Sequence, residues 1–448
     1  MKAANIITLG FCLCASVLGV AIICWAMIRT GYFASPVKTT LYLLIPGAVA
    51  VAGILLMNAS FSLRVLCCLC GAAIGSALIL HEIYAQRAAA RIAPTTEQAG
   101  VKEGHRENWP EAVYPSICGQ MLLEDRDDGT VVSMVEDNDA GLLPLAGPSN
   151  RLIRSPAKRG ADRAAKRSDE FGFNNPPGEW AVVPINYLAV GDSFTYGADV
   201  PFGRGMVDVI RAREGRTVNL GCGGNGPLMN LASLREFGPQ LRPKVVLWFH
   251  YEGNDLPKDI VRERRVALLM RYLEPGFSQE LFGRQGNIDL AIINFLKASR
   301  IQRSTPQKLT STASPKISLK SVLNLSGLRG ALGMKIEFSP ENLELFRRIL
   351  RNARNTVSAW NGRLVLVYLP NQVRFTSVFA RWDAAGYEAA VVETVRNEGI
   401  EIINLVPVFQ ATEKPERLFW GHYTEEGYRL VANTVLSALA SRQPAMGR

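Results

Sequence analysis

Two long stretches near the amino terminus contain no charged residue, and they restrict the fold more than any other feature of the chain. No Asp, Glu, Lys or Arg occurs from Asn5 to Ile28 or from Thr39 to Leu63, and a third apolar run extends from Val65 to Leu80. A helix that crosses a membrane needs about 20 mostly apolar residues. The sequence therefore predicts three transmembrane helices, at about residues 5–28, 39–57 and 64–84. A cleaved signal peptide is the alternative for the first run, although a signal core has only about 7–15 residues.

The charges that flank these helices give a weak indication of orientation. The positive residues near the predicted ends are Lys2 and Arg64 on one side, against Arg29, Lys38, Arg87 and Arg91 on the other. By the positive-inside rule, the large carboxyl-terminal part would lie in the cytoplasm. The bias amounts to two residues, so it decides little.

Composition limits the function classes open to the rest of the chain. With 448 residues, 48% hydrophobic and 20% charged, the chain is long enough for two or three domains. Six of the eight cysteines fall in the apolar runs, and the remaining Cys118 and Cys222 form neither a zinc motif nor a disulfide framework. Much of the net charge of +10 comes from a basic run between Arg154 and Arg167. This run could bind an anionic polymer or lipid headgroups, and the alternative is a solvated loop with no ligand. That run lacks interleaved aromatic residues, so no nucleic-acid partner is predicted, and we expect no metal and no cofactor.

Short apolar runs alternate with helical patterns from Trp180 onward. The predicted strands are residues 187–190, 217–220, 245–250, 364–369 and 400–405, with helices at 202–214, 228–237, 342–360, 387–398 and 425–439. This alternation predicts an α/β domain at about residues 181–442, a three-layer αβα doubly wound parallel sheet. Residues 87–180 are interpreted as a stalk and an irregular lead-in. Residues 256–337 form an insertion, which is either a lid or a surface elaboration.

Polar segments follow the first two predicted strands. Gly191-Asp192-Ser193 ends the first strand, where α/β proteins place their reactive groups. It is not the nucleophile elbow of α/β-hydrolases, because Thr195 stands where that motif needs glycine. A glycine-rich segment at residues 219–226 follows the second strand and matches G-x-G-x-x-G. A dinucleotide site would carry this pattern in the first βα unit, so the alternative is a loop whose open backbone N–H faces an oxyanion.

Two further segments complete the set of candidate groups. Asn254, after the third strand, offers an uncharged amide donor of the kind that stabilises an oxyanion. His422 is one of four histidines and the only one that precedes a helix at the end of the sheet. Histidine is the usual general base for a serine nucleophile, because its pKa lies near neutrality.

In this order and spacing, GDSFTYG, the glycine-rich segment, EGND and GHYTEEGY resemble the four marker blocks of SGNH (GDSL-type) hydrolases. The resemblance covers about residues 186–440, and a looser one points to membrane-anchored bacterial members associated with envelope polysaccharides. It implies that Ser193 is the nucleophile and His422 the base. It also implies an oxyanion hole made by the Ser193 backbone N–H, Gly224 and Asn254.

One feature of the family pattern is absent. The family usually carries an Asp two or three residues before the histidine, and here Trp420 and Phe419 occupy those places. Glu416 and Glu413 are the nearest acids, and neither is assigned. A backbone carbonyl that holds Nδ1–H would leave a Ser–His dyad.

Three hypotheses about function follow from the resemblance. The first is a serine ester hydrolase that removes acyl or acetyl groups from an envelope polysaccharide through an acyl-enzyme. The second is an O-acetyltransferase that passes the same acyl group to a glycan, and the third is an inactive domain that binds polysaccharide. The partners implied are the lipid bilayer and an acylated glycan. The resemblance places the catalytic domain outside the cytoplasm, at a bacterial inner membrane.

Overall fold

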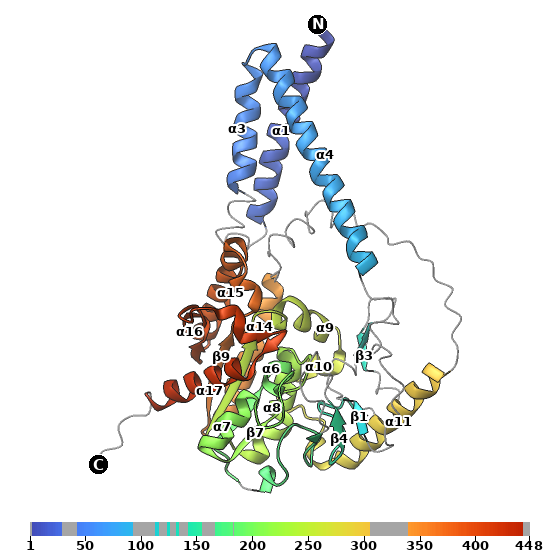
Figure 1. Cartoon of the computed structure of the whole chain (residues 1–448), viewed down its shortest axis with the longest axis vertical. Helices are drawn as coiled ribbons and strands as arrows, with labels where there is room; N and C mark the ends of the chain where they lie inside the picture. The colour runs from blue at the N-terminus through green and yellow to red at the C-terminus, as the bar shows by residue number, and fades with distance from the viewer. Residues whose placement is uncertain are drawn as a thin grey trace. The chain divides into compact units, whose positions relative to one another are not determined.

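The computed structural model describes residues 2–28, 43–92, 113–115, 123–125, 131–133, 142–154, 166–181, 183–304 and 339–441. The chain forms two compact units (Figure 1). The first contains Met1–Glu107, Leu309–Ile336 and Thr376–Ala390, and the second contains Asn108–Lys308, Glu337–Phe375 and Val391–Arg448.

Three apolar helices begin the chain: α1 (Lys2–Ile28), α3 (Ile45–Met57) and α4 (Phe61–Ile92). Two of them contain segments long and apolar enough to cross a membrane, Ala4–Cys24 and Phe61–Tyr84. The prediction of three spans is therefore wrong for the middle segment within the described residues. There, α3 has 13 residues, fewer than the roughly 20 that a span requires.

Helices α1 and α3 pack closely through small residues. Ser16 Oγ of α1 donates a hydrogen bond to the Ala50 carbonyl of α3 at 3.0 Å. A Cβ added at Gly53 would lie 2.3 Å from Ser16 Oγ, so only glycine fits at this contact. Small residues of this kind let two apolar helices approach closely.

Short strands precede the main sheet. A three-stranded sheet has the order β1 (Val113–Pro115), β4 (Leu152–Arg154), β5 (Lys166–Arg167), and β2 (Leu123–Asp125) pairs with β3 (Val131–Ser133). The predicted stalk from residue 93 to 112 lies outside the described residues, as do Cys118 and most of the basic run that begins at Arg154.

The main sheet has five parallel strands, which confirms the predicted parallel α/β sheet. Its strands are β6 (Tyr187–Val190), β7 (Thr217–Asn219), β8 (Val245–Tyr251), β9 (Arg363–Leu369) and β10 (Glu401–Asn404). Their spatial order is β7-β6-β8-β9-β10, so the chain order reverses between β6 and β8. Ligands of such sheets bind beyond the carboxyl ends of the strands at this switch point.

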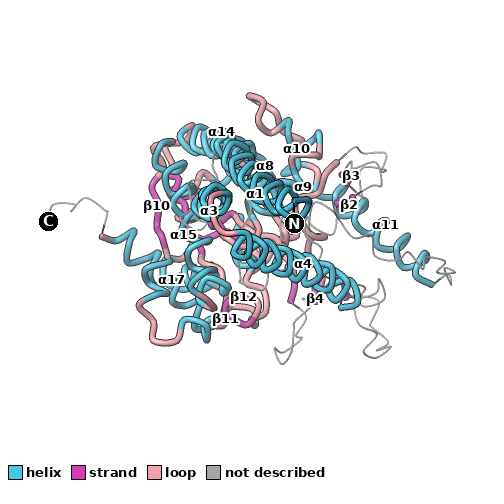
Figure 2. The backbone as a smooth tube through the Cα atoms, turned by 90° about the horizontal axis from the view of Figure 1, so that it is seen from above, coloured by secondary structure: helices cyan, strands magenta, loops and turns pink. Residues whose placement is uncertain are grey.

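Helices cover both faces of the sheet, as the three-layer prediction requires. On one face, Leu247 and Phe249 of β8 share a buried core with Ile210 of α7 (Met206–Glu214) and Val431 of α17 (Glu425–Ala440). On the other face, the His250 ring lies 5.1 Å from the Phe346 ring of α14 (Pro340–Ser358). Figure 2 shows α14 beside α8 (Pro227–Leu241) and α17 on the opposite side of the strands.

The remaining elements are short or lie outside these layers. The helices are α6 (Ser193–Tyr196), α9 (Ile260–Glu263), α10 (Ala267–Arg271), α11 (Gln285–Ser304), α15 (Val378–Asn397) and α16 (Val406–Gln410). Single turns are η4 (Glu179–Ala181), η5 (Asp255–Asp259), η6 (Leu281–Gly283), η7 (Gln372–Phe375) and η8 (Pro415–Leu418), and a small hairpin joins β11 (Phe419–Trp420) to β12 (His422–Tyr423). Residues 305–337 of the predicted insertion lie outside the described residues, so whether the insertion is a lid or a surface elaboration stays a prediction.

Candidate active site

Ser193 lies at the carboxyl end of β6, at the switch point of the sheet. Gly191 makes the break after the strand with φ of 159°, and a Cβ there would lie 2.1 Å from Thr195 Oγ1. Asp192 caps the one-turn helix α6, because its Oδ1 accepts a hydrogen bond from the Phe194 N–H at 2.9 Å. The serine is thus the first residue of a short, capped helix, with its side chain at the mouth of the sheet.

His422 approaches the serine from the other end of the domain's sequence. The β11–β12 hairpin carries it, and Gly421 makes the tight connection with φ of 93°. The His422 Nε2 lies 2.8 Å from Ser193 Oγ. The two residues predicted as nucleophile and base are therefore within hydrogen-bond distance, the geometry that proton transfer from serine to histidine needs.

The acid that orients His422 is Asp199, which the sequence reasoning missed. Asp199 Oδ2 lies 2.7 Å from His422 Nδ1, and its side chain is only 7% exposed. A carboxylate on Nδ1 fixes the tautomer that leaves Nε2 free to accept the serine proton. A carboxylate and not a backbone carbonyl therefore lies at Nδ1, and Ser193, His422 and Asp199 are arranged with the geometry of a catalytic triad.

A short turn brings Asp199 to the histidine. Gly197 ends α6 in the left-handed conformation with φ of 81°, and Asp199 itself has φ of 63°. The Ala198 N–H donates to the Ser193 carbonyl at 3.0 Å, and Tyr428 Oη of α17 donates to the Ala198 carbonyl at 3.1 Å. The nucleophile, its acid and the base-bearing segment are thereby tied to one another by backbone contacts.

The glycine-rich segment forms a turn over the same end of the sheet. The Asn225 N–H donates to the Cys222 carbonyl at 3.1 Å, with Gly224 inside the turn at φ of 77°. A left-handed residue at this place of a turn favours glycine. Among the described residues, the backbone N–H groups of Ser193 and Gly224 donate to no acceptor. Both remain open to a ligand, as the predicted oxyanion hole requires.

Asn254 is held beside the nucleophile loop by the Asp of the GDS segment. Its Nδ2 donates to Asp192 Oδ2 at 3.3 Å, so one amide hydrogen is used and one is left. Burial raises the pKa of Asp192, and the hydrogen bond from the Phe194 N–H acts in the opposite direction. The structure thus brings Asn254 to the loop that carries Ser193, and its role as an oxyanion donor is taken up as a proposal below.

A second buried layer supports these groups. Glu252 is fully buried and accepts hydrogen bonds from Arg374, Tyr368 Oη and the Asn371 N–H, at distances of 2.6–3.1 Å. His250 Nδ1 lies 3.0 Å from Asp255 Oδ2, and burial lowers the pKa of His250 to about 3. His250 is therefore a neutral structural residue.

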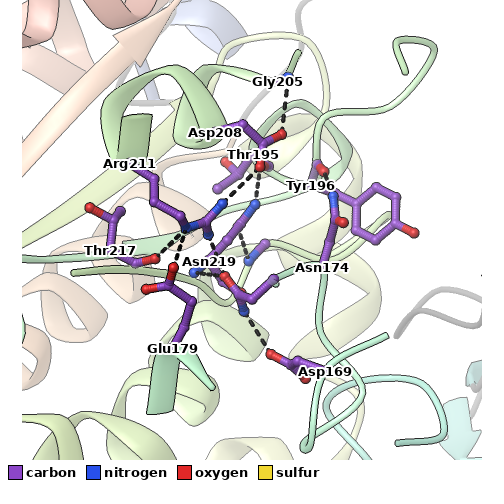
Figure 3. A network of polar contacts seen from close by, with 12 residues as sticks. Asp169, Asn174, Glu179, Thr195, Tyr196, Gly205, Asp208, Arg211, Thr217 and Asn219 are labelled. Carbon is purple, nitrogen blue, oxygen red and sulfur yellow. Dashed lines mark hydrogen bonds and ion pairs between the residues drawn. The ribbon is translucent and has the colours of Figure 1, made fainter. Parts of the chain in front are cut away.

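The lead-in contributes a polar network under the nucleophile, shown in Figure 3. Buried Asp169 accepts from Asn175 Nδ2 at 2.7 Å, and Asn175 Oδ1 accepts from the Asn219 N–H at 2.7 Å. Asn219 Nδ2 in turn donates to the Thr195 carbonyl at 2.8 Å, inside the helix that begins with Ser193. Sequence reasoning missed this support, because the interpretation of the lead-in as irregular gave its polar residues no partners.

No metal-binding cluster of three or more His, Cys, Asp or Glu side chains occurs within the ranges that the structure describes.

Neither a protein-family model nor a curated protein matches this chain. Among solved structures, it is similar to a lipolytic G-D-S-L family protein from Veillonella parvula, at 15% identity and a TM-score of 0.31, over 58% of this chain and 100% of the other. It is also similar to a lipase/acylhydrolase from Enterococcus faecalis, at 13% identity and a TM-score of 0.32, over 59% and 100% of the two chains. It is similar as well to a GDSL-like lipase from Bacteroides thetaiotaomicron, at 11% identity and a TM-score of 0.33, over 59% of this chain and 95% of the other.

Proposed function

We propose that this protein is a membrane-anchored serine ester hydrolase with Ser193 as nucleophile, His422 as general base and Asp199 as the acid that orients it. The observation that carries the proposal is the pair of contacts at His422, 2.8 Å to Ser193 Oγ and 2.7 Å to Asp199 Oδ2. In the reaction, Ser193 attacks the ester carbonyl while His422 takes its proton, and the alcohol leaves with that proton. Water then attacks the acyl-enzyme and releases the acid.

The proposed oxyanion hole consists of the Ser193 N–H, the Gly224 N–H and Asn254 Nδ2. Support comes from the two open backbone donors and from the position of Asn254 against Asp192. Negative charge develops on the carbonyl oxygen as the tetrahedral intermediate forms, and fixed donors stabilise it without reorganisation.

For the substrate, we propose an acylated glycan of the cell envelope. Trp420 supports a sugar ligand: it is 66% exposed and pairs directly with His422 in the β11–β12 hairpin. Directly opposed residues of an antiparallel pair have their side chains on the same face. An exposed indole beside the base offers a flat apolar surface to the C–H face of a sugar ring. The two helices long enough to span a bilayer support a membrane anchor. We propose that the catalytic domain lies in the periplasm, as the looser resemblance to envelope-associated members implies.

A fluorophosphonate probe tests the mechanism on the full-length protein in detergent. The account predicts covalent labelling of the wild type at Ser193, with no labelling of Ser193→Ala and strongly slowed labelling of His422→Ala. A wild type that resists the probe would refute the serine mechanism.

Product analysis with an acetylated donor and a glycan acceptor separates hydrolysis from transfer. The inactive-domain hypothesis is motivated by the missing acid and by the basic run from Arg154, and the position of Asp199 at His422 Nδ1 argues against the first of these grounds.

A further inference from the structure

The segment that follows Asn254 holds the glycine-rich turn from outside. This segment, η5 and α9 together, contains two side chains that reach back to that turn. Arg262 Nη2 donates to the Gly224 carbonyl at 2.7 Å. Glu263 accepts from the Gly226 N–H at 2.6 Å and from the Leu228 N–H at 2.8 Å. Arg262 and Glu263 are called the α9 clamp below.

The contacts of the clamp fix the peptide plane next to the proposed oxyanion donor. The peptide between Gly224 and Asn225 has its carbonyl bound by Arg262 and its N–H bound by the Cys222 carbonyl. With both ends of this peptide held, the rotation of Gly224 about its Cα–C bond is restrained. Glycine has the widest backbone freedom of any residue, so a donor on glycine depends on such outside contacts.

Packing around the turn shows that the clamp is a close fit. Gly226 lies against the clamp segment so tightly that an added Cβ would lie 2.6 Å from Asp259 Cβ and 2.8 Å from Glu263 Oε2. Arg262 has a side chain that is 16% exposed, and its Nε is buried. The same Nη2 also lies 3.6 Å from Asp259 Oδ1, so the guanidinium is held between that carboxylate and the Gly224 carbonyl.

We propose that Arg262 is a positioning residue for the oxyanion hole: it holds Gly224 in the conformation that aims its N–H at the developing oxyanion. This inference rests on the proposed ester hydrolysis at Ser193. It connects the turn after β7 to the segment after β8, so the two donors Gly224 and Asn254 are set by one structural unit. Glu263 contributes by fixing the far end of the turn.

The test compares Arg262→Gln and Arg262→Lys with Arg264→Gln in the full-length protein. Arg264 is a matched control, because it follows α9 directly and its Nη1 binds Asn342 Oδ1 at 2.8 Å, in α14. For Arg262→Gln we expect about a 10–100-fold fall in kcat on an acetyl ester with KM nearly unchanged, since a displaced donor weakens mainly the transition state. Arg262→Lys keeps a cationic donor and should recover part of this loss, and Arg264→Gln should stay within about threefold of wild type.

A thionoester analogue gives a readout that general destabilisation does not move. Sulfur is a poorer acceptor than oxygen, so the wild type should prefer the oxygen ester strongly, and this preference should shrink in Arg262→Gln. An unchanged preference and kcat in Arg262→Gln would overturn the inference. If Arg262→Gln shows no thermal unfolding transition, the same comparison is made with Arg262→Met, which also removes the donor to the Gly224 carbonyl, and an unchanged preference there overturns the inference as well. A wild type that fails to react with either ester refutes the proposed function instead.

Discussion

Asp199 adopts a left-handed backbone conformation six positions after the serine, and this one residue changes the interpretation of the site. Asp tolerates that conformation better than most residues other than glycine. Its carboxylate meets His422 at 2.7 Å, while the place that the family pattern reserves for the acid holds exposed Trp420. The role of the acid is thus filled from the nucleophile's own loop, and the position before the histidine becomes available for contact with substrate.

Replacing the acid should disable the base without disturbing the fold. Asp199→Asn keeps a hydrogen bond to the histidine but favours the wrong tautomer, so kcat should fall about 10⁴-fold. Steady-state hydrolysis of an acetyl ester measures this. Glu413→Gln and Glu416→Gln, which replace the nearest acids that precede the histidine in sequence, serve as controls and should retain full activity. A wild-type rate for Asp199→Asn would remove Asp199 from the mechanism.

Removal of the Asn254 amide, the proposed side-chain donor to the oxyanion, should lower kcat. In Asn254→Ala we expect a fall of about 100–1000-fold, because a fixed donor to the transition state is lost. KM and the thermal midpoint should change little, since the Asn254 contact to Asp192 is long at 3.3 Å. A variant with normal kcat and raised KM would place Asn254 in substrate binding instead.

At the scale of elements, α17 and the hairpin before it act as one unit. Thr424 caps the helix by accepting from the Gly427 N–H at 3.2 Å, and His422 lies two residues before it. One turn later, Tyr428 Oη binds the Ala198 carbonyl next to the acid. The helix therefore follows directly on the strand β12 that carries His422, and it also supports the loop of Asp199.

Loss of the tyrosine hydroxyl should loosen that loop. For Tyr428→Phe we expect a loss of about 1 kcal/mol in stability, the usual value of one hydrogen bond, and a several-fold fall in kcat. Thermal unfolding and steady-state kinetics on the same preparation measure both. Tyr387→Phe on α15 is a control for removing a buried hydroxyl outside the site. Equal kinetic effects in the two variants would contradict a specific role for the contact at Ala198.

The prediction from sequence was most successful where periodicity and motifs are local. Strand and helix alternation predicted the parallel sheet, and the GDSFTYG and GHYTEEGY segments identified the two residues that lie 2.8 Å apart. Asp199 was missed because a turn, and not a repeat, brings it to His422, and no pattern announces such a contact. The support from Asp169 was missed because it reaches the sheet through the contact between Asn175 and Asn219, which lie 44 residues apart in the sequence.

At the scale of the whole molecule, buried ionisable groups behind the site make stability depend on pH. Burial lowers the pKa of His250 to about 3, and burial, aided by Asp259, raises the pKa of Glu263 to about 8. In the unfolded chain the histidine binds a proton below about pH 6.5, but in the folded protein it does so only near pH 3. The free energy of unfolding that His250 contributes is therefore lost as pH falls from 6.5 towards 3. Glu263 acts in the opposite sense: its contribution is present at low pH and is lost as pH rises through 8.

Two variants should separate the pH dependence of stability that comes from His250 from that which comes from Glu263. Against wild type, His250→Asn should flatten the fall of the thermal midpoint on the acid side, where each pH unit costs up to about 1.4 kcal/mol. Glu263→Gln should flatten the fall on the alkaline side. Thermal unfolding of the full-length protein in detergent between pH 4 and pH 9 measures both. Parallel pH profiles for the variants and the wild type would show that these groups do not control stability.

The proposed catalysis requires Ser193, His422 and Asp199, three residues of the second unit, to act together. A double-mutant cycle measures this most directly, with kcat for an acetyl ester in Asp199→Asn, His422→Ala and the combined variant. Residues that act as one unit show strongly non-additive losses. The account predicts that the combined variant is no slower than His422→Ala alone. Losses that multiply would mean that Asp199 and His422 act independently, which would contradict the triad.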